Sequence, residues 1–152
     1  FMSGTGTAAP YGYGLQIRGS DTDTTVLSSY ISTNAASRAV NIASGGYANF
    51  GNGTISGGSV ISAGTGGTGI SVGFSYAFTY NQIIDAPGGK GLISTRSSYL
   101  YIKTCTISPS SRTPATTGIT ASYNATVSVE TTTNNATTPK TPASSTDGAY
   151  IS

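Results

Sequence analysis

A short hydrophobic pattern recurs along the chain. Each copy opens on a glycine or alanine and continues with an aliphatic residue, a spacer and usually a second small or apolar residue. The copies begin 22 to 30 residues apart and cover residues 14–17, 39–42, 69–72, 91–94, 118–121 and 148–151. Repeats of about two to three dozen residues are typical of solenoid proteins. We therefore expect the repeat, rather than local propensity, to determine the fold.

Two more apolar steps follow each of these anchors. Counted from the first residue of each copy, apolar residues at nine and eleven residues flank a spacer and predict a second strand. An isoleucine fourteen to seventeen residues from the same start predicts a third strand. The second step slips by one residue in the first copy, and the fifth copy has only Thr131 or Thr132 at its third step. The residues of the second step are Thr24 and Val26, Ala48 and Phe50, Phe78 and Tyr80, Leu100 and Ile102, and Val127 and Val129; the isoleucines are Ile31, Ile55, Ile84 and Ile107.

Three short strands per repeat, each alternating with a period of two, predict an all-β fold. If the repeats stack as coils, each coil completes the core of its neighbours. One column of the core would then contain Leu15, Val40, Ile70, Leu92 and Ile119. The sequence thus predicts a parallel β-solenoid of about five to six coils in a single domain, residues 1–152. An antiparallel, pilin-like β-sandwich is the alternative, supported only by Phe1 at the start of the chain.

The segments between the apolar steps are rich in glycine, serine and threonine. Residues 57–58, 64–69 and 88–91 are glycine-rich, but no helical pattern follows them, so we interpret them as wide corners rather than phosphate loops. The larger gap after residue 39 suggests an extra strand at 59–62. Residues 131–142 are expected to be a long loop of the fifth coil. Neither end shows a cap, which predicts further coils or a stacked second copy.

Charged residues are scarce and spread along the chain. Seven basic residues face five acidic ones, for a net charge of +2, and no basic cluster is visible. Nucleic acid is therefore not an expected partner. No apolar run approaches the roughly twenty residues needed to cross a bilayer. A surface of hydroxyls and amides with so little charge favours an extracellular or cell-surface location.

The chain contains no histidine. This excludes Ser-His-Asp and Cys-His triads and ordinary zinc sites, so we expect neither an enzyme nor a cofactor. Cys105 is the only cysteine, and we interpret it as a packing residue. Asp21 and Asp23 share a corner, where they are turn-forming residues or, as a weaker alternative, a calcium site. With Glu130 they are also the carboxylates that a polysaccharide-degrading enzyme would use.

Ten tyrosines and four phenylalanines are many for a chain with so few charges. With Phe78 and Tyr80 assigned inward, the candidate binding residues on the surface are Tyr76, Tyr99 and Tyr101. Exposed tyrosines stack on sugar rings or contact another protein, although packing in the core and ordinary surface positions are the simpler interpretation of the set. Three Asn-x-Thr sequences make Asn52, Asn124 and Asn135 candidate glycosylation sites.

Residues 30–47 and 52–58 resemble coils of the passenger domains of bacterial autotransporters, which are pertactin-like, right-handed β-helices. The resemblance spans about residues 14–130 and consists of a loose spacing of Gly, Ile, Ser and Thr. It implies a right-handed solenoid on the cell surface that acts in adhesion, with glycans, proteins or further copies of itself as partners. Pectin-lyase-like enzymes and phage tailspikes have similar coils, but the acidic calcium cluster of the lyases has no counterpart here. A filament that assembles by strand pairing is a further alternative.

Overall fold

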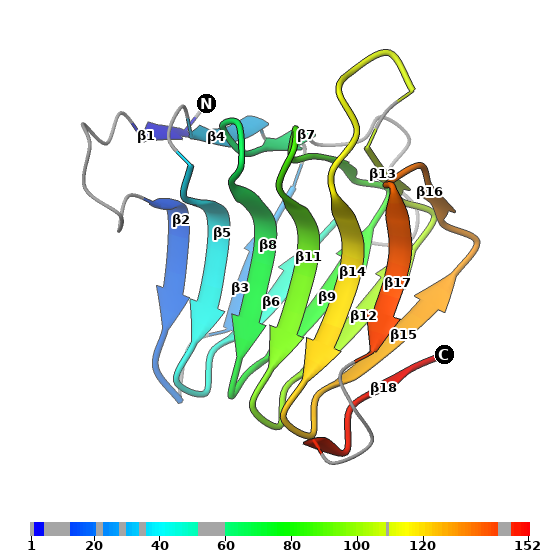
Figure 1. Ribbon diagram of the computed structural model, residues 1–152. Coiled ribbons are helices and arrows are strands. Elements are labelled where there is room, and N and C mark those ends of the chain that lie inside the picture. Colours follow the sequence, from blue (N-terminus) through cyan, green and yellow to red (C-terminus); the bar gives the residue numbers. More distant parts are fainter. Residues whose placement is uncertain are drawn as a thin grey trace.

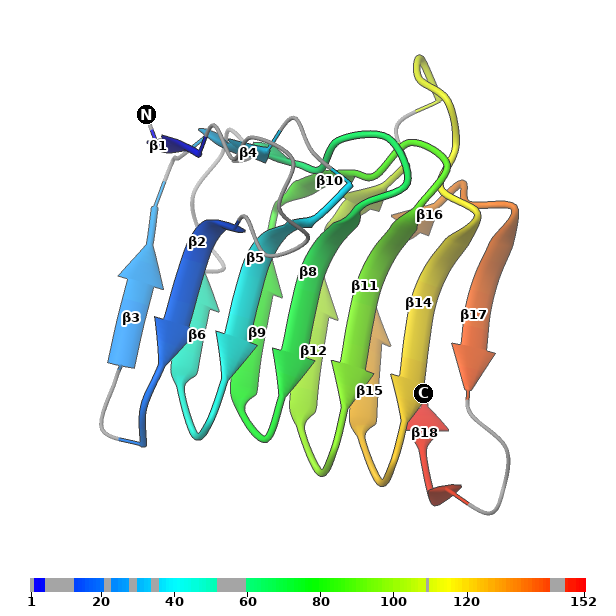
Figure 2. The same cartoon turned by 60° about the vertical axis from the view of Figure 1, so that its left-hand side comes forward.

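The structure, a computed structural model, describes residues 2–4, 13–20, 23–27, 30–33, 36–51, 60–108, 110–142 and 147–152. The strands in these ranges form three six-stranded parallel sheets, and each turn of the chain visits the three sheets in the same order (Figures 1 and 2). The protein is therefore a parallel β-solenoid of about five turns, as its repeat predicts.

Each sheet takes every third strand of the chain. The first sheet contains β1 (Met2–Gly4), β4 (Tyr30–Thr33), β7 (Val60–Ser62), β10 (Ile83–Asp85), β13 (Thr106–Ile107) and β16 (Thr133–Asn134). The second contains β2 (Tyr13–Arg18), β5 (Arg38–Ala43), β8 (Thr68–Gly73), β11 (Lys90–Thr95), β14 (Thr117–Ser122) and β17 (Thr138–Pro142). The third contains β3 (Asp23–Val26), β6 (Tyr47–Phe50), β9 (Tyr76–Tyr80), β12 (Tyr99–Lys103), β15 (Thr126–Glu130) and β18 (Tyr150–Ile151).

The coil is right-handed. In Figure 1 the chain descends along the second sheet in front and rises along the third sheet behind it, while it advances from the blue end to the red end. The first sheet closes each turn across the top. The structure therefore has the right-handed coil that the autotransporter resemblance implies.

The predicted column of the second sheet is confirmed by the strand register. Leu15 pairs with Val40, Val40 with Ile70, Ile70 with Leu92, and Leu92 with Ile119. The last four of these side chains are completely buried, whereas Leu15 is half-buried. Each coil contributes only a few apolar side chains, so the core exists only because the coils stack.

The isoleucine column of the first sheet is confirmed except at one place. Ile31 pairs with Ile61, Ile61 with Ile84, and Ile84 with Ile107. Ile61 therefore stands where Ile55 was predicted, and Ile55 lies outside the described residues. The segment 59–62 was interpreted as an extra strand, but β7 is the ordinary first-sheet strand of its coil. Nine residues lie between the end of β6 and the start of β7, whereas two lie between β9 and β10, so a constant spacing did not reveal this.

In the third sheet the prediction for β9 is wrong by one residue. Ala77 and Thr79 are completely buried and pair with Leu100 and Ile102, so Phe78 and Tyr80 face outward. The reason is the corner before the strand: two residues separate β8 from β9, whereas three separate β5 from β6, β11 from β12 and β14 from β15. Because β9 pairs in register with β6 and β12, the shorter corner brings the residue before each predicted one to the inward position.

The corners themselves are built from left-handed backbone. Between the second and third sheets, Ser44, Phe74, Arg96 and Tyr123 all have positive φ angles, and between the third and first sheets Thr104 does, with φ of 54°. Corners of successive coils bond to one another, as in Phe74 N to Arg96 O at 3.2 Å and Thr104 N to Glu130 O at 3.0 Å. A β-branched residue at positive φ is strained, and here these stacked bonds hold it.

Residues 131–142 are not a loop. They contain β16 and β17, and β17 pairs with β14 so that Lys140 follows Ile119 in the second-sheet column. The pattern at 148–151, taken as a sixth anchor, belongs to β18 in the third sheet. Threonine favours strands, but this coil lacks apolar column residues: Asn134 follows Ile107, and its Nδ2 donates to Pro139 O. The hydrophobic pattern therefore could not reveal it.

Truncation of the second-sheet column tests the stacking. We expect Leu92→Ala to lower the free energy of unfolding by about 2–5 kcal/mol, because the cavity would lie between two neighbouring coils. Ile93→Ala is the matched control, since Ile93 is the next residue on the same strand and only half-buried; it should cost clearly less. Urea titration followed by circular dichroism measures both. Equal losses for the two variants would contradict the assignment of the core.

Candidate binding face on the third sheet

The outward residues of β9 give the third sheet an outer face rich in aromatic residues. Tyr47, Tyr76 and Tyr99 are paired in register across β6, β9 and β12. Two residues further along the strands, Phe78 pairs with Tyr101, and at the strand ends Tyr80 pairs with Lys103. We call this surface the aromatic face; it consists of Tyr47, Tyr76, Phe78, Tyr80, Tyr99 and Tyr101.

Five of the six rings of the aromatic face contact one another across coils. Phe78 lies at the centre, with ring centroids 5.4 Å from Tyr47, 5.8 Å from Tyr99 and 6.2 Å from Tyr101. Tyr80 and Tyr101 meet nearly edge to face at 5.7 Å. Tyr76, with 55% of its surface exposed, is the most accessible member. Rings at these spacings stabilise one another, so the aromatic face is a preformed surface rather than a set of independent side chains.

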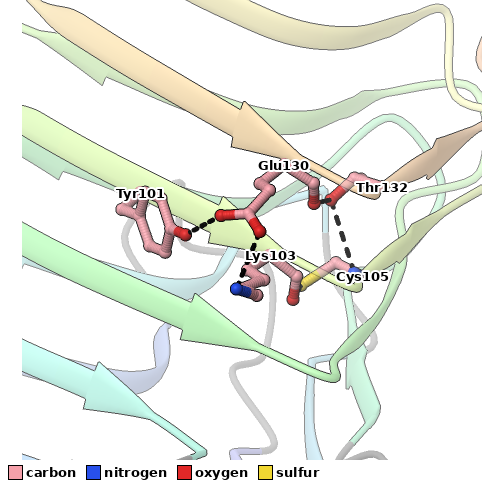
Figure 3. A network of polar contacts seen from close by, with 5 residues as sticks. All are labelled: Tyr101, Lys103, Cys105, Glu130 and Thr132. Atoms are coloured by element: carbon pink, nitrogen blue, oxygen red, sulfur yellow. Dashed lines mark hydrogen bonds and ion pairs between the residues drawn. The ribbon is translucent and has the colours of Figure 1, made fainter. Parts of the chain in front are cut away.

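A polar network borders the aromatic face (Figure 3). The Tyr101 hydroxyl donates to Glu130 Oε2, and Lys103 Nζ lies 2.7 Å from Glu130 Oε1. Hydrogen bonding by Lys103 and then by Tyr101 holds the pKa of Glu130 below its usual value. The hydrogen bond to Glu130 in turn raises the pKa values of Tyr101 and of Lys103. The network fixes the Tyr101 ring and keeps its hydroxyl protonated to higher pH.

Removal of the carboxylate tests this network. In Glu130→Gln the Tyr101 hydroxyl loses its charged acceptor, so the pKa of Tyr101 should fall toward 10. In Lys103→Gln the ammonium that lowers the same pKa is lost, so the pKa should rise. NMR titration of proteins with labelled tyrosine ring carbons measures both shifts. Movement of the two variants in the same direction would show that the network does not form in solution.

The three predicted binding residues lie on one surface. Tyr76, Tyr99 and Tyr101 all belong to the aromatic face, and Tyr76 and Tyr99 are the first residues of β9 and β12. Sequence reasoning missed Tyr47, Phe78 and Tyr80. The spacing of aromatic residues at 76, 78, 80, 99 and 101 was the available signal, because residues two apart on a strand share a face.

Asp23 and Glu130, two of the candidate carboxylates, are too far apart to form a catalytic pair. Asp23 and Glu130 lie on strands four coils apart, roughly 19 Å by the usual strand spacing, far beyond the separation that glycoside hydrolysis needs. Asp21 lies outside the described residues. Asp85 is buried and forms an ion pair with Arg112 at 2.8 Å. Within the described ranges, no three His, Cys, Asp or Glu residues lie close enough to hold a metal ion.

Cys105 is a buried packing residue, as predicted, and it lies in the corner between β12 and β13. Its Sγ is 3.4 Å from the Lys103 carbonyl oxygen and 3.5 Å from that of Thr79. Burial raises the pKa of the thiol to about 11, and the hydrogen bonds to backbone oppose this only in part. A thiol in this state is a poor nucleophile.

We expect the native protein to resist thiol reagents. With a pKa of about 11 the thiol is almost entirely protonated at pH 8, so DTNB should label Cys105 only after unfolding. The folded thiol also keeps its proton to higher pH than the ordinary value of 9.0. The free energy of unfolding should therefore fall as the pH rises from about 9 to about 11, and Cys105→Ala should lack this component. Rapid labelling of the folded protein at pH 8 would refute the burial.

The asparagines of the three Asn-x-Thr sequences differ in their surroundings. Asn124 is exposed in the corner after β14, with a positive φ of 60°. Asn135 is also exposed, but its Nδ2, the atom to which a glycan attaches, donates to Ser108 O at 3.1 Å. Asn52 lies outside the described residues. Asn124 therefore has the more suitable geometry of the two that can be compared.

The fold places the chain in the class of parallel β-solenoids. Comparisons with protein-family models, with curated proteins and with solved structures gave no match. The described residues form no helix long and apolar enough to span a membrane.

Proposed function

We propose that the protein is an adhesive scaffold that acts outside the cell, and that its aromatic face binds carbohydrate. The observation that supports this most is the gathering of six aromatic side chains on three adjacent strands of one outer sheet, where ring contacts join five of them and Tyr76 lies in register with Tyr47 and Tyr99. Outward aromatic side chains on a sheet are not needed for the core, so a binding role explains their number better than packing does.

The aromatic face has the properties of a sugar-binding surface. Tyrosine offers a flat apolar ring for the carbon-bound hydrogens of a sugar and a hydroxyl for its polar groups. The ring network leaves little conformational freedom to lose on binding, which favours affinity. Tyr76 and Tyr99, neighbours on adjacent strands, would be about 5 Å apart at the backbone, which suits successive contacts along an oligosaccharide.

The scaffold supports attachment through its stiffness. Backbone hydrogen bonds run from coil to coil in all three sheets, so a face on one sheet keeps its shape under load. The resemblance of residues 30–47 to pertactin-like coils supports the same role, since those coils belong to surface adhesins. Partners on this proposal are a cell-surface glycan or glycoprotein.

Self-assembly through strand pairing receives less support at the β17 edge. Pro139 has no amide hydrogen to donate to a further strand, and Lys140 is exposed at a position that is apolar in the preceding coils. Proline and lysine are the residues that natural edge strands use against pairing. Attachment through an outer face, rather than through this edge, therefore fits the structure better.

Substitution on the aromatic face tests the proposal. Tyr76→Ala combined with Tyr99→Ala should weaken binding to immobilised glycans roughly tenfold, since each stacking contact is worth about 0.5–1.5 kcal/mol. A panel of mannan, cellulose and chitin, with biolayer interferometry as the readout, is a suitable first measurement.

Tyr30→Ala is the matched control, because Tyr30 is an exposed tyrosine on the first sheet. It should bind like the unsubstituted protein, and all variants should keep their circular dichroism spectrum. Equal losses for Tyr30→Ala and the double variant, or no binding to any glycan tested, would overturn the proposal.

A further inference from the structure

The second sheet carries two adjoining hollows on its outer face. One, of about 430 Å³, is lined by residues that include Arg18, Arg38 and Arg96; the other, of about 450 Å³, is lined by residues that include Arg38 and Lys90. Arg38 and Ile93 line both, so the two hollows are continuous. We call this surface the basic groove. It brings together four of the seven basic residues of the chain, which are scattered in the sequence.

The shape of the basic groove follows from side-chain size. Its floor contains two small residues on neighbouring coils, Ala43 and Gly73, which pair with each other; on the next coil Ala43 pairs with Arg18. Large residues stand at its rim: Phe74 and Tyr123 in the corners are 57% and 59% exposed. Beside them, the Arg96 guanidinium lies 5.8 Å from the centre of the Phe74 ring.

Among the described residues, none neutralises the positive charge of the groove. No aspartate or glutamate is among the described residues that line either hollow, and the ion pairs of the described residues involve only Lys103 and Arg112. Arg38 donates to the neutral side chain of Asn41 at 3.0 Å, which orients its guanidinium without compensating its charge. An anionic ligand would supply the negative charge that these residues do not, because guanidinium groups bind carboxylate, sulfate and phosphate strongly.

The arrangement selects for a long ligand. Arg18 and Arg96 belong to coils three strands apart on the second sheet, roughly 14 Å at the usual spacing. Arginines on coils this far apart suit a chain with repeated negative charges better than a single small anion. The floor also offers the polar side chains of Asn41, Ser71 and Thr95, which suit the hydroxyl groups of sugars.

We propose that the basic groove binds an acidic polysaccharide, a sugar chain with carboxylate or sulfate groups at intervals along its length. Nucleic acid is the less suitable polyanion, because its affinity depends on many phosphate contacts and the groove supplies four positive charges. The groove lies on the sheet opposite the aromatic face (Figure 1), so the two surfaces are separate sites and neither proposal depends on the other.

The experiment measures Kd for heparin, polygalacturonate, dextran and a single-stranded oligonucleotide at low and high salt. Heparin carries sulfate and polygalacturonate carries carboxylate, so the tighter of the two identifies the favoured group, and dextran is the neutral reference. We expect binding to at least one acidic polysaccharide, weakened by salt, and a roughly tenfold rise in Kd in Arg18→Gln and in Arg96→Gln.

Lys140→Gln is the matched control, since it removes one positive charge from the same sheet but from outside the groove. It should change Kd less than twofold by the usual size of screened long-range effects, about 0.4 kcal/mol or below. Tyr76→Ala with Tyr99→Ala should leave this binding intact, which separates a failure here from a failure at the aromatic face. Equal effects of Lys140→Gln and the arginine variants, tighter binding of the oligonucleotide, or no binding of either acidic polysaccharide would overturn the proposal.

Discussion

Registered stacking of one coil on the next is the constraint on which the rest of the structure depends. A single coil has a few buried side chains and no hydrogen-bond partners of its own for most of its strands, so it cannot be stable alone. Ile31, Ile61, Ile84 and Ile107 form one continuous column only because β4, β7, β10 and β13 pair without a shift. The same pairing satisfies the backbone of every strand between two neighbours. Core and hydrogen bonding therefore arise together.

The corners decide what the outside of the solenoid presents. Three residues join β5 to β6 and β11 to β12, whereas only Phe74 and Ser75 join β8 to β9, and β9 still pairs in register with both neighbours. This single difference buries Ala77 and Thr79 and exposes Phe78 and Tyr80. The Thr79 hydroxyl is then buried with no hydrogen-bond partner among the described residues. This unpaired hydroxyl destabilises the fold at the strand where the outer face gains aromatic side chains. The candidate site is thus a consequence of corner length.

The fold class and the second-sheet column could be predicted from the sequence because both rest on periodic apolar residues. Three features could not be predicted in the same way. Corner length is set by left-handed residues such as Phe74 and Arg96, whose types do not mark that conformation. The last coil replaces its column residues by Asn134 and Lys140, so its strands carry no hydrophobic signal. The basic groove joins Arg18, Arg38 and Arg96 across coils, and their distance in the sequence hides their proximity.

The connections between the sheets differ in how much their length varies from coil to coil. The segments that lead from the first sheet to the second differ in length, from three residues at 135–137 to nine at 108–116. The strands after both segments keep the same register. Insertions there lengthen a protrusion and leave every face intact. The corners between β5 and β6 and between β8 and β9, which contain three and two residues, differ much less in length, and both lead into strands that keep the same register. Variation in this protein should accordingly accumulate at one edge of the solenoid, where new loops appear without disturbing the sheets that carry them.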